Sequence, residues 1–250
     1  MKNFEDQIVV VSGGAQGIGA ASAKLIAERG GRVIILDRNE AAAATIADEI
    51  QKSGGLAESM KLDVSLESEV RRTIAQILEK YKRIDALVNA AGIPGPTGVN
   101  AESLTTEDFK KVLDVNLYGP IWLTQSVLPS MKSAKYGRII HLSSIAGKEG
   151  NPGMAPYNVS KSGLIGFVKG VAKEAASSGV TINALAPAVI RTPMNDHVTD
   201  ETLKYMVSRI PVGRVGEADE VAEIIAFAAS RACSFTTGFT FDASGGRATY

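Results

Sequence analysis

The sequence has few of the residues that mark several large classes of protein. Its 250 residues include one cysteine, Cys233, and two histidines. A single cysteine excludes an intramolecular disulfide and a cysteine-rich metal site, and it fits a reducing compartment. The histidines, His141 and His197, are far apart and belong to no zinc motif. We therefore expect no catalytic metal and interpret Cys233 as a buried core residue.

The chain also has no surplus of either charge. Lysine plus arginine and aspartate plus glutamate both number 27. This balance gives no argument for a nucleic-acid partner, nor for an acidic disordered tail. No apolar run reaches the ~18 residues of a membrane-spanning helix, and the first residues lack the apolar stretch of a signal peptide. We expect a cytoplasmic protein that acts on a small molecule and binds neither nucleic acid nor membrane.

What the sequence does have is a regular alternation of strand-like and helix-like segments. With 45% hydrophobic residues, it can form one sizeable core. Runs of β-branched residues predict buried strands, and apolar residues at helical spacing predict the helices between them. The predicted strands are 8–11, 32–36, 56–62, 85–88, 138–144, 181–185 and 240–242, and the main predicted helices are 20–29, 39–53, 67–81, 106–131, 155–176 and 218–230. Because no repeat or linker divides the chain, we expect residues 1–250 to form a single α/β domain.

A glycine-rich turn follows the first predicted strand. Residues 12–19 are Ser-Gly-Gly-Ala-Gln-Gly-Ile-Gly and lead into a helix. Free backbone N–H groups at such a turn, and the positive end of the helix, favour binding of a pyrophosphate. The spacing of Gly13, Gly17 and Gly19 differs from the general dinucleotide fingerprint. A tight turn that only permits close helix packing is therefore the alternative.

Asp37 ends the second predicted strand, 18 residues after Gly19. That is near the usual distance for a carboxylate that binds ribose hydroxyls, and a carboxylate there repels a 2′-phosphate. This favours NAD over NADP, although Arg38 partly offsets the repulsion and Gln16 is compatible with either cofactor. The alternative is that Asp37 only caps the following helix.

Tyr157 and Lys161 are four residues apart in a predicted helix, so they share one face of it. A neighbouring ammonium favours the phenolate and lowers the phenol pKa from ~10 toward the working range. Tyr157 can then exchange a proton with a substrate hydroxyl. Ser144 follows the fifth predicted strand, at the strand end where open α/β sheets bind ligands, and its hydroxyl can bond the same substrate oxygen. A Tyr-x-x-x-Lys pair also arises by chance on helix surfaces.

Gly119 and Pro120 interrupt the predicted helix 106–131. Proline has no N–H to give to the carbonyl of Asn116, four residues earlier. We therefore hypothesise that the helix opens there and that this carbonyl holds a water near Lys161.

Two segments are expected to border the substrate. The loop 145–156 is rich in glycine and proline and follows Ser144 directly. Segment 193–212 has mixed polarity and weak periodicity, which we interpret as a mobile helical lid.

In this order, the Ser-Gly-x-x-x-Gly-x-Gly turn, Asn89-Ala90-Ala91-Gly92, Asn116, Ser144 and Tyr157-x-x-x-Lys161 resemble the short-chain dehydrogenase/reductase family over essentially the whole chain. The resemblance implies a Rossmann-type doubly wound α/β fold: one domain, with a mostly seven-stranded parallel sheet flanked by helices. It also implies an NAD(P)-dependent oxidoreductase. Finally, it implies a homotetramer formed through the two long helices that contain Asn116 and Tyr157.

The same resemblance implies roles for individual residues. Tyr157 would be the general acid/base, and Ser144 would orient the reacting oxygen. Lys161 would lower the tyrosine pKa and hold the ribose, while Asn116 would support a proton-relay water. The cofactor would supply the hydride. The implied cofactor contacts are Gly13, Gln16, Gly17, Ile18 and Gly19 for the pyrophosphate, Asp37 for the adenosine ribose, Asp63 and Val64 for the adenine, Asn89 for the ribose region, and Tyr157, Lys161, Ile190 and Thr192 around the nicotinamide.

Fold and cofactor do not identify the substrate. Two enzyme classes compete: a dehydrogenase that oxidises a secondary alcohol of a sugar, polyol or sugar acid, and a 3-oxoacyl-[acyl-carrier-protein] reductase-like enzyme. Because biosynthetic reductases usually use NADPH, Asp37 favours the NAD-dependent dehydrogenase. A non-catalytic dinucleotide-binding sensor is a third interpretation, but a mere binder needs neither Tyr157 nor Lys161.

Basic residues near the expected substrate loop and lid suggest an acidic substrate. Lys148, Arg191 and Arg214 are candidates to bind the carboxylate of a sugar acid, with ordinary solvated surface charges as the alternative. Arg247, in the C-terminal tail, is a candidate for a subunit contact.

Overall fold

The structure is a computed structural model and describes residues 3–196 and 198–250. Its centre is a parallel sheet of seven strands in the order β3-β2-β1-β4-β5-β6-β9. The strands are β1 (Ile8–Ser12), β2 (Arg32–Asp37), β3 (Leu56–Lys61), β4 (Ala86–Asn89), β5 (Gly137–Leu142), β6 (Val180–Pro187) and β9 (Thr240–Ala243). The fold class expected from the sequence, a doubly wound Rossmann-type α/β fold, is confirmed.

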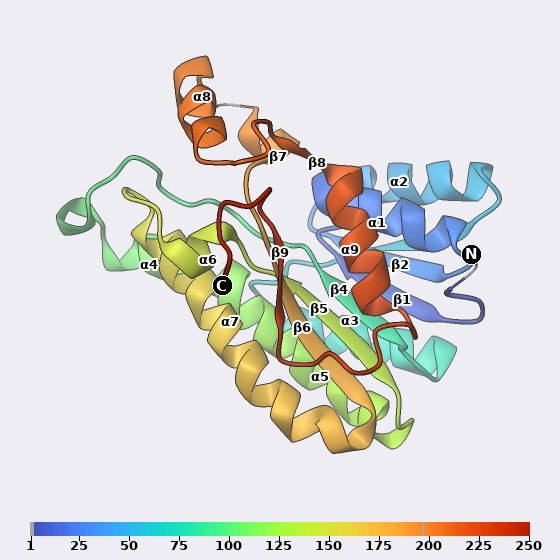
Figure 1. The fold of residues 1–250 in the computed structure, drawn as a ribbon. Coiled ribbons are helices and arrows are strands. Elements are labelled where there is room, and N and C mark those ends of the chain that lie inside the picture. Colours follow the sequence, from blue (N-terminus) through green and yellow to red (C-terminus); the bar gives the residue numbers. More distant parts are fainter. Residues whose placement is uncertain (1–2, 197) are drawn as a thin grey trace.

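Helices cover both faces of the sheet (Figure 1). The helices are α1 (Gly17–Glu28), α2 (Glu40–Lys52), α3 (Glu67–Tyr81), α4 (Thr106–Leu113), α5 (Gly119–Ser133), α6 (Ile145–Glu149), α7 (Ala155–Ala175), α8 (Asp200–Ser208) and α9 (Ala218–Ala229). Apolar residues of α1, α2 and α9 pack on one face, and those of α3, α5 and α7 pack on the other. The short 3-10 helices are η1 (Ala101–Ser103), η3 (Ala176–Ser178) and η4 (Pro193–Asn195), and η2 (Asp114–Tyr118) is a π-helix.

The first strand illustrates why these residues form a central strand. Side chains alternate between the two faces of a strand, so Val9 and Val11 enter one core and Val10 enters the other. All of β1 is buried. A strand covered on both faces needs this continuous β-branched run.

The seven predicted strands and the main predicted helices are all present, with boundaries shifted by a few residues at most. The loop predicted at 145–156 is partly wrong, because its first residues form α6. Ser144 caps this helix: its hydroxyl accepts a hydrogen bond from the backbone N–H of Ala146 at 3.1 Å. The parallel pair β7 (Ile190–Arg191) and β8 (Gly216–Glu217) was also not predicted, since two-residue strands show no periodicity.

The predicted lid segment 193–212 contains η4 and α8. In Figure 1, α8 stands apart from the body of the molecule, and none of its residues is buried. The pairing of β7 with β8 closes the base of this segment. Its movement over a substrate stays a prediction.

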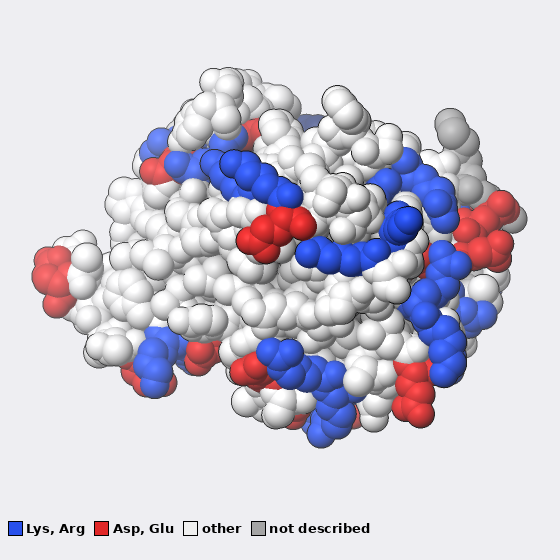
Figure 2. All heavy atoms as spheres, turned by 90° about the horizontal axis from the view of Figure 1, so that it is seen from below, with Lys and Arg blue, Asp and Glu red and all other residues white. Residues whose placement is uncertain are grey.

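The charge distribution agrees with the neutral composition. On the face seen in Figure 2, basic side chains lie next to acidic ones. In the part of the chain that the structure describes, no helix is both long and apolar enough to span a membrane. Within the same residues, no group of three or more histidine, cysteine and acidic side chains is arranged to hold a metal ion. Cys233 is buried, as expected.

Candidate active site

The candidate site lies where the strand order of the sheet reverses. β1 pairs with both β2 and β4, so the connections on its two sides run in opposite directions. Ligands of open α/β sheets bind outside the carboxyl ends of the strands at such a point. Ser12 ends β1 and Asn89 ends β4, and the Ser12 hydroxyl donates a hydrogen bond to Oδ1 of Asn89. The glycine turn and residues 89–92 therefore adjoin each other at this edge.

Glycine is required in the turn by close backbone approaches. Gly13 has φ of +70°, and a Cβ at this position would lie 2.5 Å from the backbone nitrogen of Ala91. A Cβ at Gly19 would lie 2.1 Å from the carbonyl oxygen of Gly13. Gln16 is the N-cap of α1, and among the described residues no side chain caps this helix end. Its first N–H groups therefore remain available to an anion such as a phosphate.

Asp37 belongs to this turn as well as to β2. Its Oδ2 accepts a hydrogen bond from the backbone N–H of Ala15 at 3.2 Å, and its Oδ1 accepts one from Asn39 N–H at 2.9 Å. The alternative in which Asp37 caps the next helix is wrong. The N-cap of α2 is Asn39, whose Oδ1 accepts from Ala42 N–H at 3.1 Å. The carboxylate thus stands at the rim of the glycine turn.

Other residues expected to contact the cofactor lie around the same edge. Thr192 packs against the turn, because its Cγ2 lies 3.2 Å from where a Cβ of Gly17 would be. Ile190, in β7, is buried. Asp63 follows β3, and its Oδ1 accepts hydrogen bonds from the backbone N–H and hydroxyl of Ser65 at 2.9 and 2.6 Å. Val64 has its side chain in the core.

Asn89 provides a test of whether this edge fits a bound dinucleotide. The residue is buried, and its Nδ2 has no hydrogen-bond partner among the described residues. A buried donor without an acceptor is costly, so such groups usually mark a missing partner. A polar ligand bound along the glycine turn would supply that acceptor.

Tyr157 and Lys161 lie together on α7. The Lys161 Nζ is 5.6 Å from the centre of the Tyr157 ring, and it donates a hydrogen bond to the carbonyl oxygen of Leu142 at 2.7 Å. A Cβ at Gly92 would lie 3.5 Å from this Nζ. Residues 89–92 therefore connect the glycine turn to the Tyr157–Lys161 pair. The arrangement that the sequence predicts, with both groups at one edge of the sheet, is found.

The pKa of Tyr157 differs from the expectation. Burial raises the pKa of this phenol, and a hydrogen bond with Ser144 opposes the rise. Lys161 does not lower this pKa, and its ammonium donates its hydrogen bond to the Leu142 carbonyl. Burial also lowers the pKa of Lys161, to about 8, so the ammonium form still predominates at neutral pH. Thus the protein alone keeps Tyr157 protonated.

The helix interruption predicted at Asn116 is confirmed as the π-helix η2. The backbone N–H of Gly119 donates to the carbonyl of Asp114, five residues back, which widens the helix just before Pro120. The Asn116 side chain is bonded at both ends: Oδ1 accepts from Ile93 N–H at 2.8 Å, and Nδ2 donates to the Ile93 carbonyl at 2.9 Å. The Asn116 Nδ2 also donates to the Ser160 hydroxyl at 3.2 Å, so the side-chain amide is engaged within the protein. The water near Lys161 stays a prediction.

The three cations proposed for a substrate carboxylate each have an acidic partner in the chain. Lys148 pairs with Asp242 at 2.8 Å, and its side chain is 6% exposed. Arg191 pairs with Glu217 at 3.1 Å. Arg214 donates two hydrogen bonds to the Glu220 carboxylate, at 2.6 and 2.7 Å. Of the three, Lys148 is thus the least available to a substrate.

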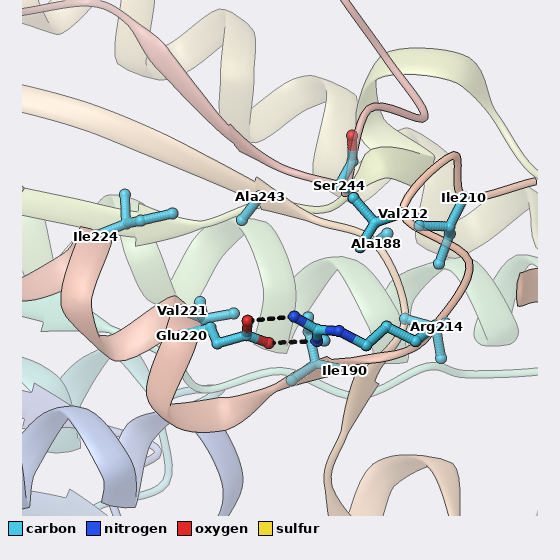
Figure 3. A pocket seen from close by; sticks show the side chains of 13 residues that line it. Ala188, Ile190, Ile210, Val212, Arg214, Glu220, Val221, Ile224, Ala243 and Ser244 are labelled. Carbon is cyan, nitrogen blue, oxygen red and sulfur yellow. Dashed lines mark hydrogen bonds and ion pairs between the residues drawn. The ribbon is translucent and has the colours of Figure 1, made fainter.

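A cavity of about 190 Å³ lies beside Ile190 (Figure 3). Sequence reasoning did not find it, because its lining comes from four separate segments, 188–190, 210–216, 220–224 and 243–245. Figure 3 shows Ile210 and Val212 from the base of the lid segment and Ile224 from α9, with Arg214 reaching across to Glu220. The cavity therefore adjoins both the lid segment and the residue expected beside the nicotinamide.

A parallel sheet with a glycine turn at its switch point and a Tyr–Lys pair beside that turn defines a class of dinucleotide-dependent oxidoreductases. A family model described as enoyl-(acyl carrier protein) reductase matches residues 13–248. The chain is 40% identical to the 2-dehydro-3-deoxy-L-rhamnonate dehydrogenase (NAD(+)) of Sphingomonas sp. (strain SKA58), over 99% of this chain and 97% of that protein. It is 42% identical to the 3-oxoacyl-[acyl-carrier-protein] reductase of Synechocystis sp. (strain ATCC 27184 / PCC 6803 / Kazusa), over 96% of each.

The solved structure of a protein named gox2181 superposes with a TM-score of 0.95 at 33% identity, and the match covers 98% of this chain and 97% of that one. The chain belongs to the short-chain dehydrogenase/reductase family, a family of oxidoreductases, as its motifs predicted.

Proposed function

We propose that this protein is an NAD-dependent dehydrogenase that interconverts a secondary alcohol and a ketone, with a sugar acid as the preferred substrate and sugars or polyols as further candidates. The observation that carries the cofactor assignment is the place of Asp37, whose carboxylate bonds the glycine turn through Ala15. A negative charge there repels a 2′-phosphate and accepts ribose hydroxyls. The Sphingomonas relative, named as an NAD(+) dehydrogenase of a sugar acid, supports the same assignment.

The chain's own residues divide the work of binding the cofactor and moving the proton. The glycine turn would hold the pyrophosphate on backbone N–H groups, and Asp37 the ribose. When bound, the nicotinamide accepts or supplies the hydride. Ser144 orients the reacting oxygen. The protonated Tyr157 donates its proton to the ketone oxygen during reduction, and it has to lose that proton before it accepts the hydroxyl proton during alcohol oxidation. Lys161 supplies a buried positive charge next to the Tyr157 ring.

The substrate carboxylate would meet the exposed arginines at the base of the lid. The side chains of Arg191 and Arg214 are 70% and 54% exposed, so both remain reachable beside their acidic partners. Lys148, the third candidate, would first have to leave Asp242. The lid segment 193–212 would then close over the bound sugar acid.

A 3-oxoacyl-[acyl-carrier-protein] reductase is the second candidate function. The Synechocystis relative with that name is 42% identical to this chain. In that case the favoured cofactor would be NADPH, and Asp37 would oppose its 2′-phosphate. The non-catalytic sensor is a remote third candidate.

A dehydrogenase screen with NAD and NADP against sugar acids, polyols and 3-hydroxyacyl thioesters separates these functions. We expect NAD reduction with a sugar acid. Turnover of the thioester with NADP alone would support the reductase, and cofactor binding without any turnover would support the sensor.

We also propose that the protein is a cytoplasmic homotetramer assembled through the helices that contain Asn116 and Tyr157. Large apolar side chains on these helices are exposed, with Tyr118 at 45% and Val159 at 49%. Tyr118 also stacks on Trp122, with ring centres 5.8 Å apart. Burial of such side chains against a second copy would remove apolar surface from water. Light scattering during gel filtration tests the oligomeric state, and a monomeric mass would contradict it.

A further inference from the structure

The C-terminal tail is bonded to the loop that connects Ser144 and Tyr157. In Figure 1 the C-terminus lies beside α6. The Arg247 Nε donates to Oε2 of Glu149 at 2.9 Å, and its Nη2 donates to Oδ1 of Asn151 at 2.8 Å. The Arg247 side chain is 8% exposed, so the guanidinium is almost enclosed by these contacts. Arg247 thus contacts the loop of its own chain, and the subunit contact expected for it stays a prediction.

The two partners of Arg247 lead to the two catalytic hydroxyls. Glu149 is the last residue of α6, whose N-cap is Ser144. Asn151 is tied to α7 by two hydrogen bonds with Asn158, at 3.0 and 2.8 Å. Asn158 follows Tyr157 directly. One nearly enclosed guanidinium therefore connects the last residue of α6 with Asn151, which is bonded to α7.

Further contacts strengthen this connection. The Lys148 ammonium pairs with Asp242 at the end of the sheet, and the Tyr250 hydroxyl donates to the Lys148 carbonyl at 2.7 Å. From the lid segment, Arg209 approaches Glu149 to 3.8 Å. Glu149 is thus shared by a cation of the tail and a cation of the lid.

We propose that Arg247 is a positioning residue, which through Glu149 and Asn151 fixes segment 145–154 and so sets the distance between the Ser144 and Tyr157 hydroxyls. Its role in turnover rests on the proposed function. A buried, forked guanidinium suits this task, because it bonds two acceptors in a fixed plane, whereas a lysine ammonium bonds as a point charge. Small misplacements of catalytic groups reduce turnover strongly while cofactor binding persists.

Replacing Arg247 with methionine tests the proposal by removing both bonds at similar side-chain length. In the cofactor-free protein, we expect faster hydrogen–deuterium exchange in peptides covering 145–158, with no change in those covering β1 and α1. We expect kcat to fall by about tenfold to a hundredfold, while the Kd for NAD changes by less than about twofold. Arg247→Lys should give an intermediate kcat, because it retains the ion pair with Glu149 only.

Arg29→Met is the matched control. Arg29 makes two 2.6 Å contacts with Glu223 at the opposite end of α1 from the glycine turn. Its loss should leave both the kcat and the exchange of 145–158 unchanged. If Arg247→Met does not fold, Asn151→Ala is measured in its place, since it removes one of the two bonds.

Two results would overturn the positioning role. One is wild-type exchange in 145–158 together with wild-type kcat. The other is faster exchange across the whole chain, which would show general stabilisation instead. A wild-type protein without dehydrogenase activity would refute the proposed function, and the exchange measurement would still test the tie between tail and loop.

Discussion

Two parts of the site are held by different interactions. The cofactor side consists of the glycine turn and Asp37, and the substrate side consists of segment 145–154 and the C-terminal tail. On the cofactor side, backbone N–H groups of the turn are the donors. Gly13 N–H donates to the Leu36 carbonyl at 2.8 Å, and Ala15 N–H donates to the Asp37 carboxylate, 22 residues away. On the substrate side, side chains join segments that are distant in sequence. The Lys148–Asp242 contact spans 94 residues, and the Arg247–Glu149 contact spans 98.

This difference indicates where the protein tolerates change. A turn whose donors are backbone groups tolerates most side-chain substitutions. It does not tolerate a Cβ at the glycines that lie against other backbone atoms. A loop held by ion pairs keeps the fold when one pair is lost, yet its geometry shifts. We therefore expect cofactor binding to depend on a few glycines and substrate specificity to depend on charged residues.

The largest effect is expected from Gly13→Ala. The added Cβ would lie 2.5 Å from a backbone nitrogen, at φ of +70°. NAD binding should be lost and the free energy of unfolding should fall by several kcal/mol, on the order of an overpacked core site plus backbone strain. Calorimetric titration and urea unfolding measure both. Gly54→Ala is the control, since φ there is +82° but nothing lies within 4 Å of its Cβ. Equal effects of the two variants would show that strain alone, and not overlap, governs the turn.

A smaller but specific effect is expected from Asp37→Asn. The amide can still accept the hydrogen bond from Ala15, but the charge that repels a 2′-phosphate is gone. An ion pair or repulsion at about 4 Å is worth about 4 kcal/mol near a protein surface, so the ratio of kcat/KM for NADP over NAD should rise at least about tenfold. An unchanged ratio would refute the role of Asp37 in cofactor choice.

The sequence predicted the cofactor side better than the substrate side, for a physical reason. The glycine turn and Asp37 follow strands within one βα unit, so local patterns indicate their places. The Tyr157–Lys161 pair and Pro120 were equally readable, since helical spacing and a missing N–H are local properties.

The contacts of Lys148 and Arg247 could not be predicted, because they depend on how the last strand places the C-terminal tail. The direction of the Tyr157 pKa shift was wrong for a related reason. Burial in the folded protein raises this pKa and Lys161 does not lower it, and burial cannot be read from a four-residue spacing.

His141, a buried residue of β5, gives a pH-dependent prediction. Burial, and next the charge of Lys161, lower its pKa from 6.5 to about 3, so it is neutral in the folded state. Between those pH values the unfolded chain binds the proton and the folded one does not. Stability is therefore lost as the pH falls from 6.5 toward 3, with a slope of up to about 1.4 kcal/mol per pH unit. His141→Gln should remove this slope in urea unfolding, and an unchanged acid limb would contradict it.

The smallest effect is expected from Arg191→Ala. This ion pair is largely exposed, so its loss should change the free energy of unfolding by less than about 1 kcal/mol. If Arg191 meets a substrate carboxylate, KM for a sugar acid should rise a few fold, while KM for a neutral polyol stays the same. If the substitution leaves the KM for the sugar acid unchanged as well, Arg191 does not bind the substrate and is an ordinary surface charge.

The most direct measurement compares turnover and NAD affinity of Tyr157→Phe in one preparation. Removing this single hydroxyl should lower turnover by about 10²–10⁴-fold, because the reacting oxygen loses the group that exchanges its proton. The Kd for NAD should change by less than about twofold, because the glycine turn is untouched. Turnover close to that of the wild type would contradict the account, and so would a parallel loss of turnover and NAD binding.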